Sequence, residues 1–109
     1  KNEGLFVMPI DLERRTLSEP ILVSLGEPTT TSIQPSEVFA AALKLDAKSI
    51  ILAHNHPSGD PTPSIQDRQL TEVMKKLGKT IGIEVLDHLV IGNHGSNSVE
   101  LMIGAWNAH

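Results

Sequence analysis

The residues best suited to chemistry in this sequence are two histidines, His54 and His56, which follow a short apolar run. In an extended strand, residues two positions apart point to the same side with Cα atoms roughly 6–7 Å apart, so two ring nitrogens can converge on one ion. Asp67 falls in the first turn of the next predicted helix and can supply a carboxylate from the opposite side. Two His and one Asp leave the fourth position of a tetrahedral site for water, which is typical of catalytic zinc.

The same residues also fit roles that need no zinc. A lone His-x-His pair is weak evidence for a metal, and Ser64, three positions before Asp67, also fits a helix-capping box. Both roles of Ser64 can hold together. Two His and one carboxylate can also bind iron in an oxygenase, but those sites usually lie in an eight-stranded barrel, for which this chain has too few strands. The letters His-Asn-His match the name of a nuclease class only textually, because that class separates these residues along a ββα unit.

The hydrophobic pattern predicts the elements that must position these residues, in the order ββαβαββ. A continuous apolar run at 49–53 predicts a central buried strand, and helical spacing predicts a helix from Ser64 to about Lys79, with Gly78 and Gly82 as places to stop. Pro9 indicates an edge, a bulge or the end of the first strand, because it cannot donate to a ladder. The other strands are expected at 4–10, 20–25, 82–92 and 98–103, the last after a turn at 93–97, and the first helix at 35–45. This order predicts an α/β sandwich with a mixed sheet.

Composition excludes several classes of protein. Nine basic and thirteen acidic residues give a net charge of −4, with no Lys/Arg cluster longer than a pair, so we expect no direct nucleic-acid binding by this chain alone. Aromatic residues make up 3%, too few for a surface that stacks several bases. The absence of cysteine excludes disulfides and thiolate metal sites. No apolar run approaches the ~18 residues of a membrane span, so we expect no membrane partner.

The length of 109 residues predicts one domain over residues 1–109. Because the chain begins with Lys1 rather than Met, we expect it to be excised from, or related to, something longer. Its first residues carry no signal-peptide pattern, and we expect a cytoplasmic location.

The segment from His54 to Asp67 carries a family resemblance. His-x-His-Pro-Ser-Gly followed by Pro-Ser-x-x-Asp resembles the JAMM/MPN+ metalloprotease signature in its RadC-like form, and the flanking runs at 47–53 and 86–92 are similar as well. The resemblance covers nearly the whole chain. It implies a cytidine-deaminase-like α/β/α sandwich of the JAB/MPN type, and zinc held by His54, His56 and Asp67. It also implies that Ser64 stabilises an oxyanion.

The family further uses a Glu of the first strand as general base, eight residues before the Asp that ends that strand. Counting back from Asp11 gives Glu3, close enough to the start of the chain that a frayed end would misplace it. The resemblance therefore implies a zinc-dependent metallohydrolase, a peptidase or isopeptidase that acts on a protein or peptide by activating water. An alternative is a non-catalytic zinc-binding accessory domain of DNA repair or recombination, as an older label of the family suggests.

Some residues lie outside this expected set. His88, in an alternating strand beside Asp87, is expected to be packed or to support the site rather than to bind metal. His94 and His109 are assigned no role. The chain has Pro35-Ser36-Glu37 where RadC-like chains often have Pro-Arg-Glu, and Pro9 interrupts a strand that is usually apolar; neither departure touches an expected ligand.

Overall fold

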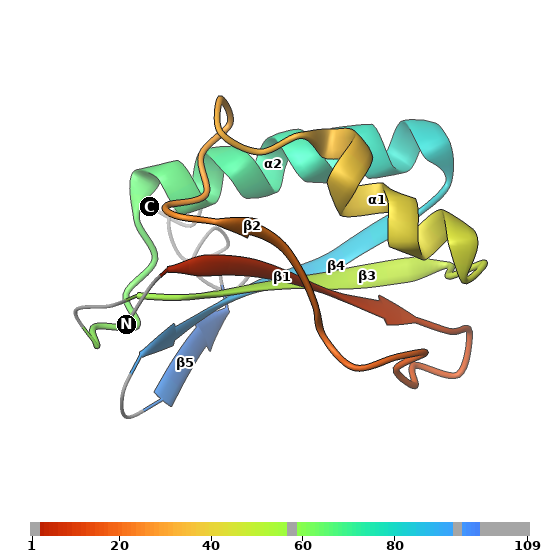
Figure 1. Cartoon of the computed structure of the whole chain (residues 1–109), viewed down its shortest axis with the longest axis horizontal. Coiled ribbons are helices and arrows are strands. Elements are labelled where there is room, and N and C mark those ends of the chain that lie inside the picture. Colours follow the sequence, from red (N-terminus) through yellow and green to blue (C-terminus); the bar gives the residue numbers. More distant parts are fainter. Residues whose placement is uncertain (1–2, 57–58, 93–94, 99–109) are drawn as a thin grey trace, which may run out of the picture.

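The computed structural model describes residues 3–56, 59–92 and 95–98. These residues form five strands and two helices in one mixed sheet and a helical layer (Figure 1). The sheet order is β2-β1-β3-β4-β5, in which β3 and β4 are parallel and the other neighbours are antiparallel. The elements are β1 (Gly4–Ile10), β2 (Ile21–Leu25), α1 (Pro35–Lys44), β3 (Ser49–Asn55), α2 (Ile65–Ile81), β4 (Glu84–Gly92) and β5 (Gly95–Ser98). The predicted α/β class, element order and mixed sheet are confirmed.

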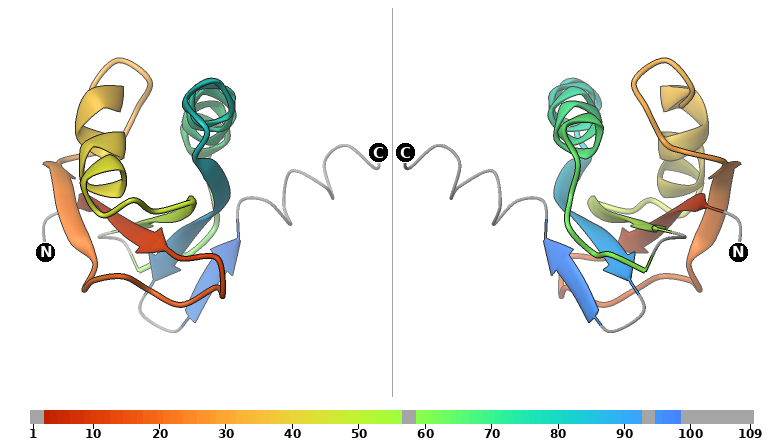
Figure 2. Two further views of the ribbon diagram at one scale, coloured as in Figure 1. Left: turned by 90° about the vertical axis from the view of Figure 1, so that its right-hand side faces the viewer. Right: turned by 90° about the vertical axis from the view of Figure 1, so that its left-hand side faces the viewer.

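Both helices lie on the same face of the sheet (Figure 2). Alternate residues of the inner strands, such as Leu5, Val7, Ile50 and Leu52, point to this face and pack with apolar residues of α1 and α2. On the opposite face, side chains such as Phe6 and Ile51 are only partly buried. The described residues therefore build two layers, and among them there is no helix for the third layer of an α/β/α sandwich.

One irregularity in the sheet decides which side chains of β4 face the helices. Ile50 of β3 pairs with Val85, but Ile51 pairs with Asp87, so Leu86 is an extra residue in β4. Such a bulge reverses the alternation of the strand beyond it. As a result, Val85, His88 and Val90 are all buried, although their numbers do not share one parity.

Helix α2 begins and ends at residues with clear capping roles. The Ser64 hydroxyl accepts a hydrogen bond from the Asp67 N–H at 3.1 Å, and the Asp67 carboxylate accepts one from the Ser64 N–H at 2.7 Å, which together make the capping box. The helix passes through Gly78 and ends before Gly82, whose φ of 84° is left-handed. Gly78 has another use: a Cβ there would lie 2.2 Å from the Ile83 carbonyl oxygen, so its absence lets α2 approach the start of β4.

Pro9 lies at the end of its strand, one of the three positions that its missing donor allows. It is the last but one residue of β1, beyond the residues that pair with β2. Its carbonyl accepts from the Leu17 N–H at 2.8 Å, and in an extended strand the nitrogen of the same residue points to the same side. The pairing with β2 ends at Val7, so the missing N–H of Pro9 takes no hydrogen bond away from β2.

The last strand differs from the prediction. Gly95 to Ser98 form β5 in register with β4, so the expected turn at 93–97 was wrong for residues 95–97. Polar residues favoured a turn, and the strand is recognisable only from its pairing with β4. The rest of the strand predicted at 98–103, residues 99–103, lies outside the described part of the chain.

Candidate metal centre

The two histidines of the motif lie at the carboxyl end of β3, on the face that the helices cover. His54 belongs to β3, which runs two residues further than predicted, and pairs with Leu5 on one side and Val90 on the other. Its side chain is completely buried. His56 follows the strand; its N–H donates to the Ile91 carbonyl at 2.9 Å and its Nδ1 lies 2.8 Å from the Asp60 carbonyl oxygen. These contacts hold both rings at the carboxyl ends of the parallel strands β3 and β4.

Helix α2 brings Asp67 to the same place. Its Oδ1 lies 3.1 Å from His54 Nε2, and its Oδ2 lies 3.4 Å from His56 Nε2. Ligand atoms 2.0–2.1 Å from a tetrahedral zinc ion lie about 3.3 Å apart. Each Asp67 contact is thus about as long as the spacing between two ligands of one such ion, although the two contacts use different oxygens.

Glu3, the residue just before β1, also belongs to this group, although it lies far from the histidines in the sequence. Its Oε2 lies 3.8 Å from His54 Nε2, and ligand atoms of Glu3, His54 and His56 all lie within 4.8 Å of one another. The backbone holds Glu3 on both sides: its carbonyl accepts from the Gly26 N–H at 2.7 Å, and the next N–H, of Gly4, donates to Asn55 Oδ1 at 3.0 Å. Glu3 is therefore anchored, and its position near the first residue does not misplace it.

The carboxylate of Asp67 is ionised at neutral pH. Burial raises its pKa, but the Ser64 N–H and, whenever the His54 ring carries a proton on Nε2, that ring lower the pKa, to about 2 when both act. Ser64 uses only its oxygen lone pair to cap the helix, so its hydroxyl hydrogen is left for another acceptor. The capping role of Ser64 is thus confirmed, and the chemical role is compatible with it.

One buried nitrogen indicates that a cation fits this group. In the described part of the chain, His54 Nε2 is buried without a hydrogen-bond partner, because Asp67 Oδ1, although 3.1 Å away, lies outside hydrogen-bond geometry. An unpaired buried polar atom is costly. A lone pair facing two carboxylates has an obvious partner in a metal ion. Glu3, His54 and His56 are a set that could hold one, and Asp67 lies beside both histidines.

Two further buried residues contact the group from behind. His88 Nε2 lies 2.7 Å from His54 Nδ1, and His88 Nδ1 lies 2.8 Å from the Thr71 hydroxyl. Burial, with some help from the His54 ring, lowers the pKa of His88 to about 3, so its ring is neutral at pH 7. His88 is packed, as predicted. Thr71 was missed, although its place one helical turn after Asp67 was a readable signal.

Asp60 borders the group, because its backbone carbonyl oxygen is the partner of His56 Nδ1. The Asp60 carboxylate accepts from the Thr62 N–H and hydroxyl, and Glu37 belongs to α1, beside β2. His94 and His109 are outside the described residues.

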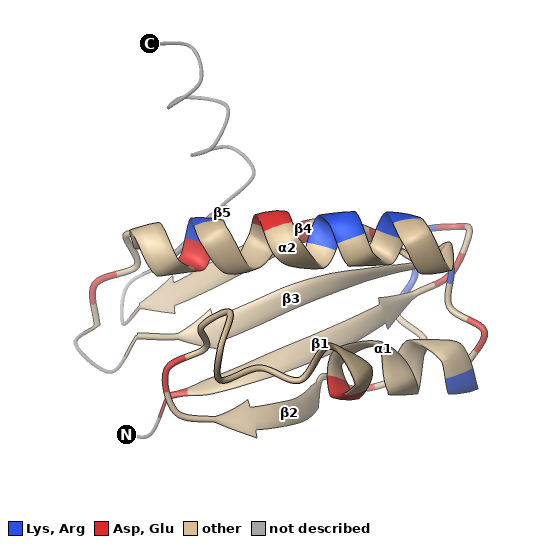
Figure 3. Cartoon of the chain, turned by 90° about the horizontal axis from the view of Figure 1, so that it is seen from above, with Lys and Arg blue, Asp and Glu red and all other residues tan. Residues whose placement is uncertain are grey.

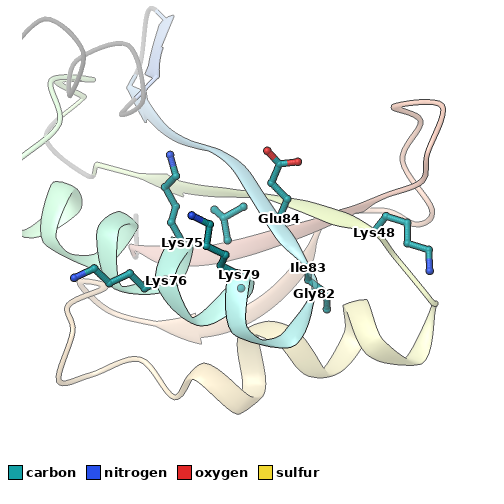
Figure 4. A pocket seen from close by; sticks show the side chains of 9 residues that line it. Lys48, Lys75, Lys76, Lys79, Gly82, Ile83 and Glu84 are labelled. Carbon is teal, nitrogen blue, oxygen red and sulfur yellow. The ribbon is translucent and has the colours of Figure 1, made fainter.

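A pocket of about 430 Å³ lies at the other end of α2 (Figure 4). Lys48, Lys75, Lys76 and Lys79 line it together with Glu84, so the fold gathers four lysines that the sequence showed only singly or as a pair. In α2, Asp67, Arg68 and Glu72 precede Lys75, Lys76 and Lys79 (Figure 3), so the last part of the helix is the more basic one, as suits the helix dipole. The lysine side chains point in different directions (Figure 4), and they do not converge on one point as the histidines do.

A mixed α/β sheet with histidines and carboxylates gathered at the end of a central strand defines a candidate metal-binding α/β domain. Residues 1–102 match the RadC-like JAB domain, and the chain belongs to that family. It is 54% identical over 76 residues to the UPF0758 protein STH371 of Symbiobacterium thermophilum, covering 70% of this chain and 32% of that protein. It is 44% identical over 92 residues to the UPF0758 proteins CT0611 of Chlorobaculum tepidum and Mbar_A2303 of Methanosarcina barkeri, covering 84% of this chain and 41% and 40% of theirs. The chain thus spans 32–41% of the length of these relatives.

Neither described helix combines the length and the apolar character that crossing a membrane requires.

Proposed function

We propose that this domain is a zinc-dependent metallohydrolase of the JAMM type, which cleaves a peptide or isopeptide bond. The observation that carries this proposal is the buried His54 Nε2, which has no hydrogen-bond partner among the described residues and faces the carboxylates of Asp67 and Glu3 at 3.1 and 3.8 Å. Membership of the RadC-like JAB family supports it, since JAB domains are often hydrolytic.

In this proposal His54, His56 and Asp67 hold the zinc ion. Glu3 also has a ligand atom within 4.8 Å of both histidines, but Asp67 is preferred as the third ligand. One of its oxygens lies 3.1 Å from His54 Nε2, the other lies 3.4 Å from His56 Nε2, and its carboxylate is ionised and almost completely buried. Bound zinc supplies a water molecule whose pKa is lowered to near 7. Three protein ligands leave the position that this water requires.

Glu3 then acts as general base and later as general acid. Its carboxylate lies slightly farther from His54 Nε2 than the ligand spacing, at 3.8 Å, which suits a group that accepts a proton from water beside the ion. The same group returns the proton to the leaving amine. The Ser64 hydroxyl donates to the developing oxyanion, a contribution worth ~2.7–4 kcal/mol where such donors have been removed in other enzymes.

Metal content and turnover test this proposal together. We expect the purified domain to carry about one zinc ion per chain by elemental analysis. We also expect it to cleave members of a panel of peptide and isopeptide-linked substrates, to stop after chelation and to recover when zinc is restored. A domain that binds no zinc when zinc is supplied would contradict the metal assignment. A zinc-loaded domain that cleaves no member of the panel would favour the non-catalytic alternative.

That alternative, an accessory zinc domain of DNA repair or recombination, would use Glu3 as a fourth ligand of a closed site. The distance of 3.8 Å from Glu3 Oε2 to His54 Nε2, longer than the 3.1 Å of Asp67 Oδ1, favours a place beside the water instead. The net charge of −4 also offers few phosphate contacts. We therefore propose a protein or peptide as the partner, and neither nucleic acid nor a membrane.

We expect no appreciable binding of duplex DNA by this domain at physiological salt. Fluorescence anisotropy with a labelled duplex at several salt concentrations measures it, and a Lys75→Ala/Lys79→Ala double variant shows whether any signal comes from the lysine-lined pocket. Sub-micromolar affinity that weakens steeply with salt, and that the double variant loses, would revive the accessory function.

Two finer expectations from the sequence belong to the same proposal. We propose that a further layer covers the second sheet face, as in a cytidine-deaminase-like α/β/α sandwich; the partly buried Phe6 and Ile51 on that face support it. The cytoplasmic location expected from the sequence stays a prediction.

A further inference from the structure

A line of buried side chains runs from the back of His54 into helix α2. His54 Nδ1 lies 2.7 Å from His88 Nε2, and His88 Nδ1 lies 2.8 Å from Thr71 Oγ1. The Thr71 hydroxyl lies 2.7 Å from the backbone carbonyl oxygen of Asp67. All three side chains are fully shielded from solvent.

The direction of each hydrogen bond in this line follows from the last one. A carbonyl oxygen can only accept, so the Thr71 hydroxyl donates to Asp67 and accepts from His88 Nδ1–H. A neutral imidazole has one N–H, so His88 Nε2 is a lone pair and accepts from His54. His54 therefore carries a proton on Nδ1, and in the neutral ring the Nε2 lone pair points toward Asp67 and Glu3.

We propose that His88 is a positioning residue, which holds His54 as the Nδ1–H tautomer so that Nε2 is free to bind the metal ion. This inference rests on the proposed function, because it concerns the same site. Without His88, the carboxylates near Nε2 would favour a proton on Nε2, the form that cannot bind a metal. The Thr71 hydroxyl in turn orients His88.

Packing alone does not account for His88. The neighbours of the site on the same sheet face, Leu52 and Val90, are apolar, and an apolar residue at position 88 would fill the space without burying two polar nitrogens. Both His88 nitrogens have partners at 2.8 Å or less, His54 on one side and Thr71 on the other. With both nitrogens hydrogen-bonded, His88 fixes the orientation of the His54 ring.

Zinc affinity of two variants tests the role. His88→Leu removes the acceptor for His54, whereas His88→Gln can supply an amide oxygen to His54 and an amide N–H to Thr71. Loss of a partner behind a ligating histidine typically costs 10–100-fold in metal affinity. In competition with a chromophoric chelator, we expect His88→Leu to bind zinc 10–100-fold more weakly than the parent, and His88→Gln to recover most of the loss. Thermal unfolding of the metal-free proteins shows that each variant is folded.

Nitrogen NMR gives a second measurement that needs no variant. Scalar coupling across the N–H···N bond of ¹⁵N-histidine-labelled protein identifies which ring carries the proton, and we expect it on His54 Nδ1, both before and after zinc is added. A proton on His88 Nε2 instead would contradict the donor order derived above.

The failures of the two proposals differ. A parent that binds no zinc overturns the proposed function. A parent that binds zinc while His88→Leu binds it equally well, or a proton found on His88 Nε2, overturns the role of His88 and leaves the metal site standing.

Discussion

Glu3→Gln is expected to keep its zinc and to lose about 10²–10⁴-fold in amide hydrolysis, the usual contribution of a general acid–base. Glutamine has nearly the same shape as glutamate but cannot take a proton from water. The backbone contacts that hold this residue, with Gly26 and through Gly4 with Asn55, do not involve the carboxylate, so the variant should fold as the parent does. Elemental analysis and steady-state kinetics on one cleavable substrate measure the two effects separately.

Glu19→Gln is a matched control, because Glu19 is exposed in the segment between β1 and β2 and makes the same change of charge. Its activity should equal that of the parent. Loss of zinc from Glu3→Gln would show that Glu3 is a ligand and that the site has no open position. Full activity with zinc retained would require another base, such as Glu37 of α1 or Asp60, whose carboxylate accepts from the Thr62 N–H and hydroxyl.

His56→Ala and Asp67→Asn are expected to lose both zinc and activity, because each removes one of three protein ligands. Asparagine is the informative replacement at position 67: its amide oxygen can still accept from the Ser64 N–H and preserve the helix cap, but its charge is gone. Zinc titration at micromolar protein should therefore show no stoichiometric binding by either variant, while circular dichroism shows a folded domain.

Ser64→Ala separates the cap from the metal. Loss of the hydroxyl should lower the unfolding free energy by about 1 kcal/mol, as N-cap replacements do, and should leave the zinc content unchanged.

For the two ligand variants, full zinc occupancy in both His56→Ala and Asp67→Asn would refute the ligand set.

The strand and helix patterns were enough to predict where the histidines and Asp67 meet. The apolar run of β3 predicts an extended strand, and the Ser64–Asp67 cap fixes the start of α2, so both partners of the contact are readable locally. Glu3 lies far away in the sequence, and its place came from the family spacing. Its anchor, the Gly4 contact with Asn55, depends on how β1 pairs with β3 and has no local signal.

The contact between His88 and His54 could not be predicted from alternation. A regular β4 that buries Val85 would turn His88 to the opposite face, and only the extra residue Leu86 restores it to the helical side. A bulge depends on the pairing of two strands, which a single strand's pattern does not record. The position of β5 was likewise mispredicted because its polar residues resemble a turn when the pairing with β4 is not known.

The double use of Asp67 links two equilibria that are usually independent. Its carboxylate accepts from the Ser64 N–H at the start of α2 and also faces both histidines, so opening the first turn of the helix would dismantle the ion site. An ion that binds only the closed form stabilises it by RT ln(1 + [L]/Kd), about 2.7 kcal/mol at a free concentration one hundred times Kd. Local fraying of the helix start, ordinarily among the least costly motions of a protein, would then become as rare as release of the metal.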